Sequence, residues 1–294
     1  MGASIKDVAE RAGVFTATVS HVLNGTRQTR PVTQQKVMTA VRELRYSQNQ
    51  AARNLARGRS SLLGLIISDI PSPFFPEITS AFQEHALRHN LDAVVLNTNY
   101  DPQRTLNAVK RLIGLQVPGV AVLTSQIDPN VRRLLVESNI AAVYLDLGRV
   151  DKLVSNILLD YEHGIVEALE HLTGMGHRRI AYIGGPLHLH SAQQRKRAFA
   201  ESARRLGLEP PQMADSDFTV KGGYFAASKL LGSHSPSAVI AGNDLTAIGV
   251  LHAAYDAKLH VPGDLSMLGF DDISFAEYSQ PALTTVSVPR AEIG

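Results

Sequence analysis

From residue 62 onward, short aliphatic runs alternate with helical stretches, and this alternation constrains the fold more than any other feature of the sequence. Patterns typical of buried strands occur at 62–68, 93–97, 120–124 and 141–145, and again at 180–183, 238–241 and 265–269. Helical patterns lie between them, at 76–90, 102–115, 129–138, 161–174, 192–206, 222–231 and 245–257. Strands that alternate with helices pair in parallel, and the helices cover both faces of the sheet. The two series therefore predict two α/β lobes, in which ligands bind at the carboxyl ends of the strands.

The first 24 residues carry a different pattern, two short helices joined by a glycine. Ser4 and Asp7 have the spacing of a capping box, and apolar residues recur at helical spacing from Ile5 to Ala12. Gly13 follows, where helices commonly end in a left-handed residue. A second apolar stripe leaves outward-facing positions at Thr16, Ala17, Ser20 and His21. The pattern indicates a helix-turn-helix, whose second helix enters the DNA major groove, and an ordinary helical hairpin is the alternative.

A third helical pattern begins at Pro31 and repeats apolar residues from Val37 to Leu44. Two short helices cannot bury both of their apolar stripes alone, so we expect the third to cover them and residues 1–46 to form a three-helix domain. Residues 1–60 hold 10 Lys and Arg against three acidic residues, a net charge of +7, and the remainder carries −5. A basic head on a mildly acidic body favours a polyanionic partner for the head, with a merely solvated basic surface as the alternative.

Residues 47–60 follow as a short basic segment with one large apolar residue, Leu55, and a helix-breaking Gly58. A helix of about eight residues is marginal in water, so this segment is expected to order only when it is supported. A plain linker is the alternative.

The composition and the absence of certain motifs argue against several classes of protein. With no cysteine, the chain has no disulfides, cysteine nucleophiles or thiolate metal sites. The amino terminus does not have the pattern of a secretory signal. The apolar runs of the chain are too short to span a bilayer, so we expect a cytoplasmic protein without membrane contact. No nucleophile elbow, Walker loop or dinucleotide fingerprint is present, which argues against an enzyme.

Polar and aromatic residues gather where strands of the two predicted lobes end. The first strand leads to Asp69 and then to Ser72-Pro73-Phe74-Phe75, and later strand ends carry further acidic, amide and aromatic residues. An aromatic platform, an arginine and several carboxylates fit a small polar ligand such as a sugar. Taken one at a time, each residue has a simpler explanation. An Asp that follows a strand more often caps a helix or forms a turn, and a Phe is more often part of the hydrophobic core. His188 and His190 lack a third ligand of predictable spacing, which disfavours a metal site.

Several of these motifs carry a family resemblance. IKDVAERAGV followed by TATVSHVLNGTR resembles the amino terminus of the lactose-repressor/purine-repressor (LacI) family of bacterial transcription regulators. LGLIISDIPSPFF, GHRRIAYIGGP, GNDLTAIG and LGFDDISFAEYSQPALTTV resemble effector-domain signatures of the same family, in family order from about residue 4 to about residue 290. The resemblance implies a helix-turn-helix (lambda-repressor-like) head and a two-lobed periplasmic-binding-protein-like effector domain. The predicted divisions are 1–46 for the head, 47–60 for a hinge helix and 61–294 for effector binding and dimerisation.

The resemblance also implies residues that contact a palindromic operator in double-stranded DNA. Base edges would be read by Thr16, Ala17 and His21, and phosphates held by Ser20 and Asn24. A paired hinge helix would lie in the minor groove with Leu55 wedged between base pairs. The full predicted set is Thr16, Ala17, Thr18, Ser20, His21, Asn24, Asn49, Ala52, Arg53 and Leu55. The chain departs from the family at Phe15, where a Ser cap is usual, and at Gln48, where many members have Pro.

For the effector, the resemblance implies the contacts Phe74, Asp146, Asp160, Ser191, Arg195, Phe218, Asn243 and Asp271. Leu189 stands where a purine-binding member has an arginine, which favours a sugar over a purine. No cofactor or metal is expected. Family members usually continue beyond residue 294, so a terminal helix and strands are expected to be missing and dimerisation weakened. The predicted function is a homodimeric, ligand-responsive repressor. A solute-binding protein and a sugar- or nucleotide-modifying enzyme with a DNA-binding head are the alternatives.

Overall fold

The computed structural model describes residues 3–47, 60–124, 128–146, 150–210, 212–232 and 236–294. The chain divides into two compact units, Met1–Ser60 and Ser61–Gly294. No helix among the described residues is both long and apolar enough to cross a membrane.

The first unit contains three helices, α1 (Ile5–Ala12), α2 (Thr16–Asn24) and α3 (Pro31–Glu43). The predicted capping box is confirmed, because the Ser4 N–H donates to Asp7 Oδ2 over 2.7 Å and the Asp7 N–H donates to Ser4 Oγ over 3.3 Å. Gly13 ends α1 in the left-handed conformation, at φ +66°. The three helices share one small core, formed by Val8, Ala9, Ala12, Val19, Val37 and Ala40. The predicted three-helix head is therefore present.

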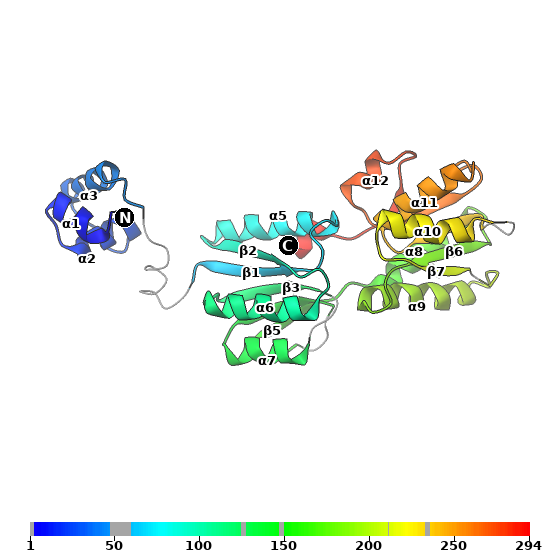
Figure 1. Ribbon diagram of the computed structural model, residues 1–294, viewed down its shortest axis with the longest axis horizontal. Coiled ribbons are helices and arrows are strands. Elements are labelled where there is room, and N and C mark those ends of the chain that lie inside the picture. Colours follow the sequence, from blue (N-terminus) through cyan, green and yellow to red (C-terminus); the bar gives the residue numbers. More distant parts are fainter. Residues whose placement is uncertain (1–2, 48–59, 125–127, 147–149, 211, 233–235) are drawn as a thin grey trace. The chain divides into compact units, whose positions relative to one another are not determined.

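The second unit begins with a lobe built on a five-stranded parallel sheet, which we call the N-lobe (Figure 1). Its strands are β1 (Leu62–Ile67), β2 (Asp92–Asn97), β3 (Gly119–Leu123), β4 (Ala141–Leu145) and β5 (Val154–Ile157), in the spatial order β2-β1-β3-β4-β5. Its helices are α5 (Phe74–Arg88), α6 (Pro102–Gly114) and α7 (Pro129–Glu137). Late in the chain, α13 (Arg290–Ile293) returns to this lobe, where Ile293 packs against its core.

The second lobe, the C-lobe, has the same construction. Its parallel sheet has the order β10-β9-β8-β6-β7, from the strands β6 (Ile180–Gly184), β7 (Met213–Asp215), β8 (Ala238–Ala241), β9 (Ser266–Asp271) and β10 (Thr284–Ser287). Its helices are α8 (Tyr161–Gly174), α9 (His190–Arg205), α10 (Val220–Leu230), α11 (Asp244–Asp256) and α12 (Ser274–Tyr278). The chain crosses between the lobes at 158–160 and again at 288–289.

Each sheet is covered on both faces, as the alternation of strands and helices predicts. In the C-lobe one apolar cluster joins α8 and α9 to the sheet through Tyr182 and Phe199, and another joins α10 and α11 through Ile183 and Val250. In the N-lobe α6 and α7 cover one face and α5 covers the other. Both sheets are therefore buried, and their strand ends supply the polar residues between the lobes.

The structure corrects some predicted boundaries. The helix predicted at 76–90 begins at Phe74, because Pro76 occupies the first turn, where the missing N–H of proline is tolerated. The helix predicted at 192–206 begins at His190. Three strands that the sequence pattern did not predict, β5, β7 and β10, are the short edge strands of the two sheets.

Candidate DNA-binding surface and effector pocket

Helix α2 of the head presents its polar side chains to solvent. Val19 is fully buried, so the opposite side of the helix faces outward. Thr16 and Ala17 are exposed. The other candidate DNA contacts on this helix are partly exposed, namely Thr18, Ser20, His21 and Asn24. The outward orientation expected of a recognition helix is therefore present, and contact of these six residues with DNA remains a prediction.

Hydrogen bonds hold the carboxyl end of α2 in place. The Asn24 side-chain amide donates to the Ser20 carbonyl over 2.8 Å and lies 3.2 Å from the Ser20 hydroxyl. His21 Nδ1 lies 2.9 Å from Thr26 Oγ1 in the following turn. The contact with Thr26 orients the ring of His21, so its other nitrogen is presented in a defined direction.

The amino end of α2 has no side-chain cap. Phe15 occupies the N-cap position with an extended backbone, makes no capping hydrogen bond and is 85% exposed. The N–H groups of a helix's first turn have no partner within the helix, and an uncapped end can take a phosphate instead. The expected loss of a cap at Phe15 is confirmed. The hinge residues Asn49, Ala52, Arg53 and Leu55 lie outside the described part of the chain.

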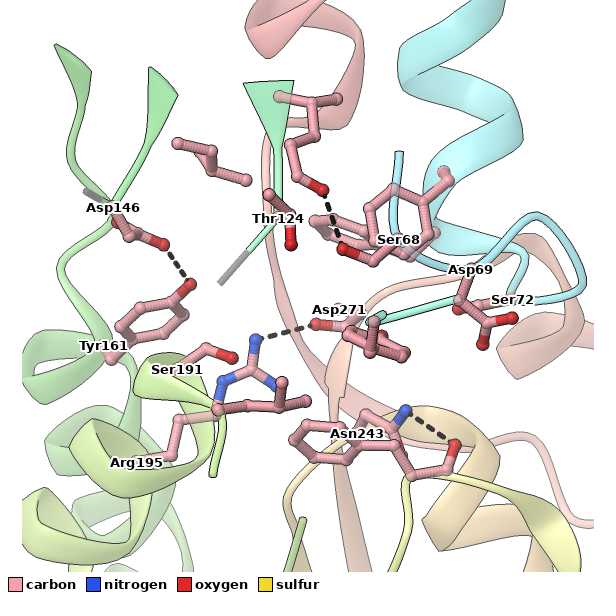
Figure 2. Close-up of a pocket in the computed structure, with 17 residues that line it drawn as sticks. Ser68, Asp69, Ser72, Thr124, Asp146, Tyr161, Ser191, Arg195, Asn243 and Asp271 are labelled. Carbon is pink, nitrogen blue, oxygen red and sulfur yellow. Dashed lines mark hydrogen bonds and ion pairs between the residues drawn. The ribbon is translucent and has the colours of Figure 1, made fainter. Parts of the chain in front are cut away.

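A pocket lies between the N-lobe and the C-lobe, at the carboxyl ends of their strands (Figure 2). Seven of the eight predicted effector contacts line it: Phe74, Asp146, Ser191, Arg195, Phe218, Asn243 and Asp271. They come from both lobes. Phe74 opens α5 and Asp146 follows β4, whereas Asn243 caps α11 and Asp271 ends β9. The sequence positions predicted to meet at this edge therefore do so, and ligand contact remains a prediction.

Arg195 is the central cation of the pocket, and it is 5% exposed. Its Nη2 donates to Asp271 Oδ1 over 3.2 Å and its Nη1 donates to the Gly242 carbonyl. Its guanidinium carbon lies 4.1 Å from the ring centre of Phe270 and 4.8 Å from that of Tyr161, so the cation is held between aromatic rings. Its Nε is buried and has no hydrogen-bond partner among the described residues, which leaves a donor inside the site.

Burial also changes the acidity of Asp271, which is 6% exposed. Removal from water raises the pKa of its carboxyl from 3.8 to about 6, although the nearby cations Arg195 and Arg290 lower it. At neutral pH the carboxylate is therefore ionised, and it can accept hydrogen bonds from hydroxyl groups.

Asp146 is tied to the segment where the chain crosses between the lobes. Its Oδ1 accepts the Leu159 N–H over 2.9 Å, and its Oδ2 accepts the hydroxyl of Tyr161. Burial raises the pKa of that phenol, so Tyr161 remains a donor. Asp146, Phe218 and Asp271 all have a left-handed backbone, at φ +60°, +63° and +110°. Such conformations are costly for residues with side chains and cluster at binding sites.

Asp160 is the predicted contact that does not line this pocket. Its Oδ1 accepts the His163 N–H over 2.9 Å and caps α8. It lies in a neighbouring depression together with Leu158, His190 and Glu201. Its position matches the helix-cap alternative, and a direct role with the effector is not supported by its placement.

The pocket also contains residues that the sequence did not assign to it. Tyr100 and Tyr161 are the two polar aromatics of this set, and each lies in a loop or first turn that follows a strand. Their position after a strand end is the signal that could have identified them. Ser68, Leu123, Thr124 and Leu145 line the pocket and were not assigned to it either. Asp69, Ser72 and Phe75, which the sequence places at a strand end expected to meet a ligand, also line it, as does Leu189. Among the described residues, no three His, Asp or Glu side chains come together to hold a metal ion.

Family models match both parts of the chain. The model described as bacterial regulatory proteins, lacI family, matches residues 4–49, and a periplasmic binding protein-like domain matches residues 169–294. The lac repressor dimer bound to operator and the anti-inducer ONPF is similar to this structure, with a TM-score of 0.89 and 28% identity. The match covers 100% of this chain and 89% of that one.

Curated relatives match along nearly the full chain. The HTH-type transcriptional repressor PurR of Glaesserella parasuis serovar 5 (strain SH0165) is 34% identical over 295 residues, which is 99% of this chain and 87% of the relative. The ribose operon repressor of Escherichia coli (strain K12) is 34% identical over 301 residues, 99% of this chain and 90% of the relative. Since these relatives cover nearly the whole chain at 34% identity, the chain belongs to the lacI family of bacterial regulatory proteins and is a DNA-binding transcription regulator.

Proposed function

We propose that this regulator represses transcription as a homodimer on a palindromic operator, and that a small sugar-like ligand between the lobes controls its affinity for DNA. The observation that carries the proposal is the convergence of seven predicted contacts, from both lobes, on one pocket. A ligand held by both lobes has different affinities for different lobe arrangements, and this difference is what shifts the operator affinity. Since operators are chromosomal, the proposed site of action is the bacterial cytoplasm.

The chemistry of the pocket supports a sugar more than a purine. Asp69, Asp146 and Asp271 offer carboxylate oxygens to hydroxyl groups, and aromatic rings can pack against the C–H face of a sugar ring. Leu189, which is 2% exposed, lines the pocket at the position where the resemblance places an arginine in a purine-binding member of the family. Among similar proteins, one solved structure is the complex of the transcriptional regulator CelR with cellobiose, with a TM-score of 0.72 and 28% identity over 99% of this chain and 89% of that one.

On DNA, α2 is proposed to read the major groove. Thr16, Ala17 and His21 would reach base edges, while Ser20, Asn24 and the uncapped N–H groups of α2 would hold phosphates. Leu55 of each hinge would open the central base step.

The ligand half of the proposal is tested by a thermal-shift screen of pentoses, hexoses, disaccharides and nucleobases. A ligand of the pocket should raise the unfolding midpoint of the wild type. Asp271→Asn should lose that shift because it removes the carboxylate, whereas Asp92→Asn, at an exposed position in the N-lobe, should keep it. A shift that survives Asp271→Asn would contradict the assigned site.

The DNA half is tested by selecting duplexes from a random library, with and without each ligand found. His21→Ala should cost about 1–3 kcal/mol of discrimination at one base pair of each half-site. Gln35→Ala, exposed on α3, should leave sequence selection unchanged. Binding should fall steeply with added salt because phosphate contacts release counterions. Failure to select any sequence, under all ligand conditions, would refute the proposal.

A further inference from the structure

Arg290 is a buried cation that does not line the ligand pocket. It opens α13 and is 7% exposed. Each of its guanidinium nitrogens has an acceptor. Nε donates to Glu77 Oε2 over 2.7 Å, Nη1 to the carbonyl of Asp271 and Nη2 to the carbonyl of Asp272. A side chain with so many partners is held in one position.

The partners of Arg290 belong to different lobes. Glu77 lies on α5 of the N-lobe, against which α13 packs. Asp271 and Asp272 lie at the end of β9 in the C-lobe. Arg290 directly follows the second crossing between the lobes at 288–289, so it joins them where the chain itself does. We call the set Glu77, Arg290 and the two carbonyls the Arg290 strap.

The C-lobe end of the strap lies next to the ligand pocket. Asp271 and Asp272 both have left-handed backbones, at φ +110° and +58°, which L-residues adopt reluctantly. This conformation allows two consecutive carbonyls to accept from one guanidinium. The side chain of the same Asp271 points to Arg195 inside the pocket, 3.2 Å away. The backbone that Arg290 holds thus sets where the pocket carboxylate lies.

We propose that Arg290 is a positioning residue: it fixes Asp271 in the ligand pocket and, through Glu77, holds the two lobes in one relative orientation. Its consequence for ligand control rests on the proposed function, whereas the lobe orientation can be measured without any ligand. A planar guanidinium with several fixed donors can bond a carboxylate and two carbonyls at once. The ammonium of a lysine is a compact charge that cannot reproduce this geometry.

The experiment is a distance measurement between the lobes by pulsed electron paramagnetic resonance. Because the chain has no cysteine, Lys110→Cys on α6 and Lys229→Cys on α10 provide two unique, exposed labelling sites, one in each lobe. The labelled full chain is mixed with excess unlabelled protein, so that each dimer carries one labelled copy. Arg290→Gln, Arg290→Lys and Glu77→Ala are compared with the wild type in this background.

The wild type should give one narrow distance distribution. Arg290→Gln should widen it by about twofold or move its maximum, as expected when two lobes lose a contact that restricts a hinge. Arg290→Lys should be intermediate. The double variant Arg290→Gln/Glu77→Ala should be no wider than Arg290→Gln alone, because the two residues act as one unit. An unchanged distribution in Arg290→Gln, or additive widening in the double variant, would overturn the proposal.

Two controls separate the strap from general loss of structure. Arg88→Gln breaks an ion pair with Glu84 on the same helix, but both side chains are about two-thirds exposed, so the distribution should not change. Glu77→Ala removes only the N-lobe end of the strap, at a carboxyl that is 45% exposed, and keeps the test available if Arg290→Gln fails to fold. If Glu77→Ala folds with a wild-type distribution, the proposed coupling is wrong, whatever the ligand screen finds.

Discussion

Replacing Phe15 by Ser should stabilise the head. Phe15 already has the extended backbone of an N-cap, at φ −73° and ψ 151°, and its carbonyl accepts the Thr18 N–H over 2.9 Å, but its side chain offers no oxygen to the first-turn N–H groups of α2. Its ring is 85% exposed, so removing it sacrifices little buried apolar area. A Ser hydroxyl there can accept from the N–H of Ala17 or Thr18, as Ser4 already accepts from Asp7 in α1.

The expected gain is about 1 kcal/mol, the usual difference between a Ser cap and a residue without one. Because the chain has two units, a single melting curve would mix their contributions. Hydrogen exchange resolves them, since 1 kcal/mol should slow exchange of the most protected head amides by about fivefold. Amides of the second unit should be unaffected.

Phe15→Ala provides the matched control. It removes the same ring without adding an acceptor, so the difference between the Ser and Ala variants measures the cap alone. If both variants show equal protection, or if the Ser variant is the less protected, the interpretation of Phe15 as an unfilled cap is refuted.

Three further predictions concern the second unit. Tyr161→Phe removes the hydrogen bond to Asp146 and should lower the free energy of unfolding by about 1.5–3 kcal/mol, measured by urea denaturation. Ligand affinity should fall as the pH drops through about 6, the pKa of Asp271, because protonation removes an acceptor and the countercharge of Arg195; calorimetry across this range checks it. Burial raises the pKa of the Asp244 carboxyl from 3.8 to about 7. Its contribution to the free energy of unfolding is therefore complete below pH 3.8 and is lost as the pH rises through about 7. Asp244→Asn, which can still bond Thr285, should remove that slope from the pH dependence of unfolding.

The sequence predicted the centre of each sheet better than its edges. Central strands such as β1 and β8 are uniformly apolar because helices cover both of their faces. The strands that were not predicted, β5, β7 and β10, are all at sheet edges and only three or four residues long. Edge strands are partly solvated and carry polar residues, so periodicity gives little signal for them.

The pocket was largely predictable, whereas the contacts that hold it together were not. Strand ends can be located along the sequence, and parallel sheets bring them to one edge. The strap joins Glu77 to Arg290, which are 213 residues apart, and nothing local in either segment indicates the other. Pairings of this kind depend on how the two lobes meet, and only the tertiary structure supplies that information.

Asp146 and Asp160 illustrate where sequence reasoning about a site ends. Both follow strands, and both received the same interpretation as ligand contacts. Asp146 has a left-handed backbone and lines the pocket, whereas Asp160 precedes a helix and gives its carboxylate to the His163 N–H. Hydrogen bonding to the protein does not separate the two, because Asp146 is also engaged, at Oδ1 by the Leu159 N–H and at Oδ2 by the Tyr161 hydroxyl. The backbone conformation at the end of the strand, more than the residue type, therefore decides which aspartate can serve the pocket.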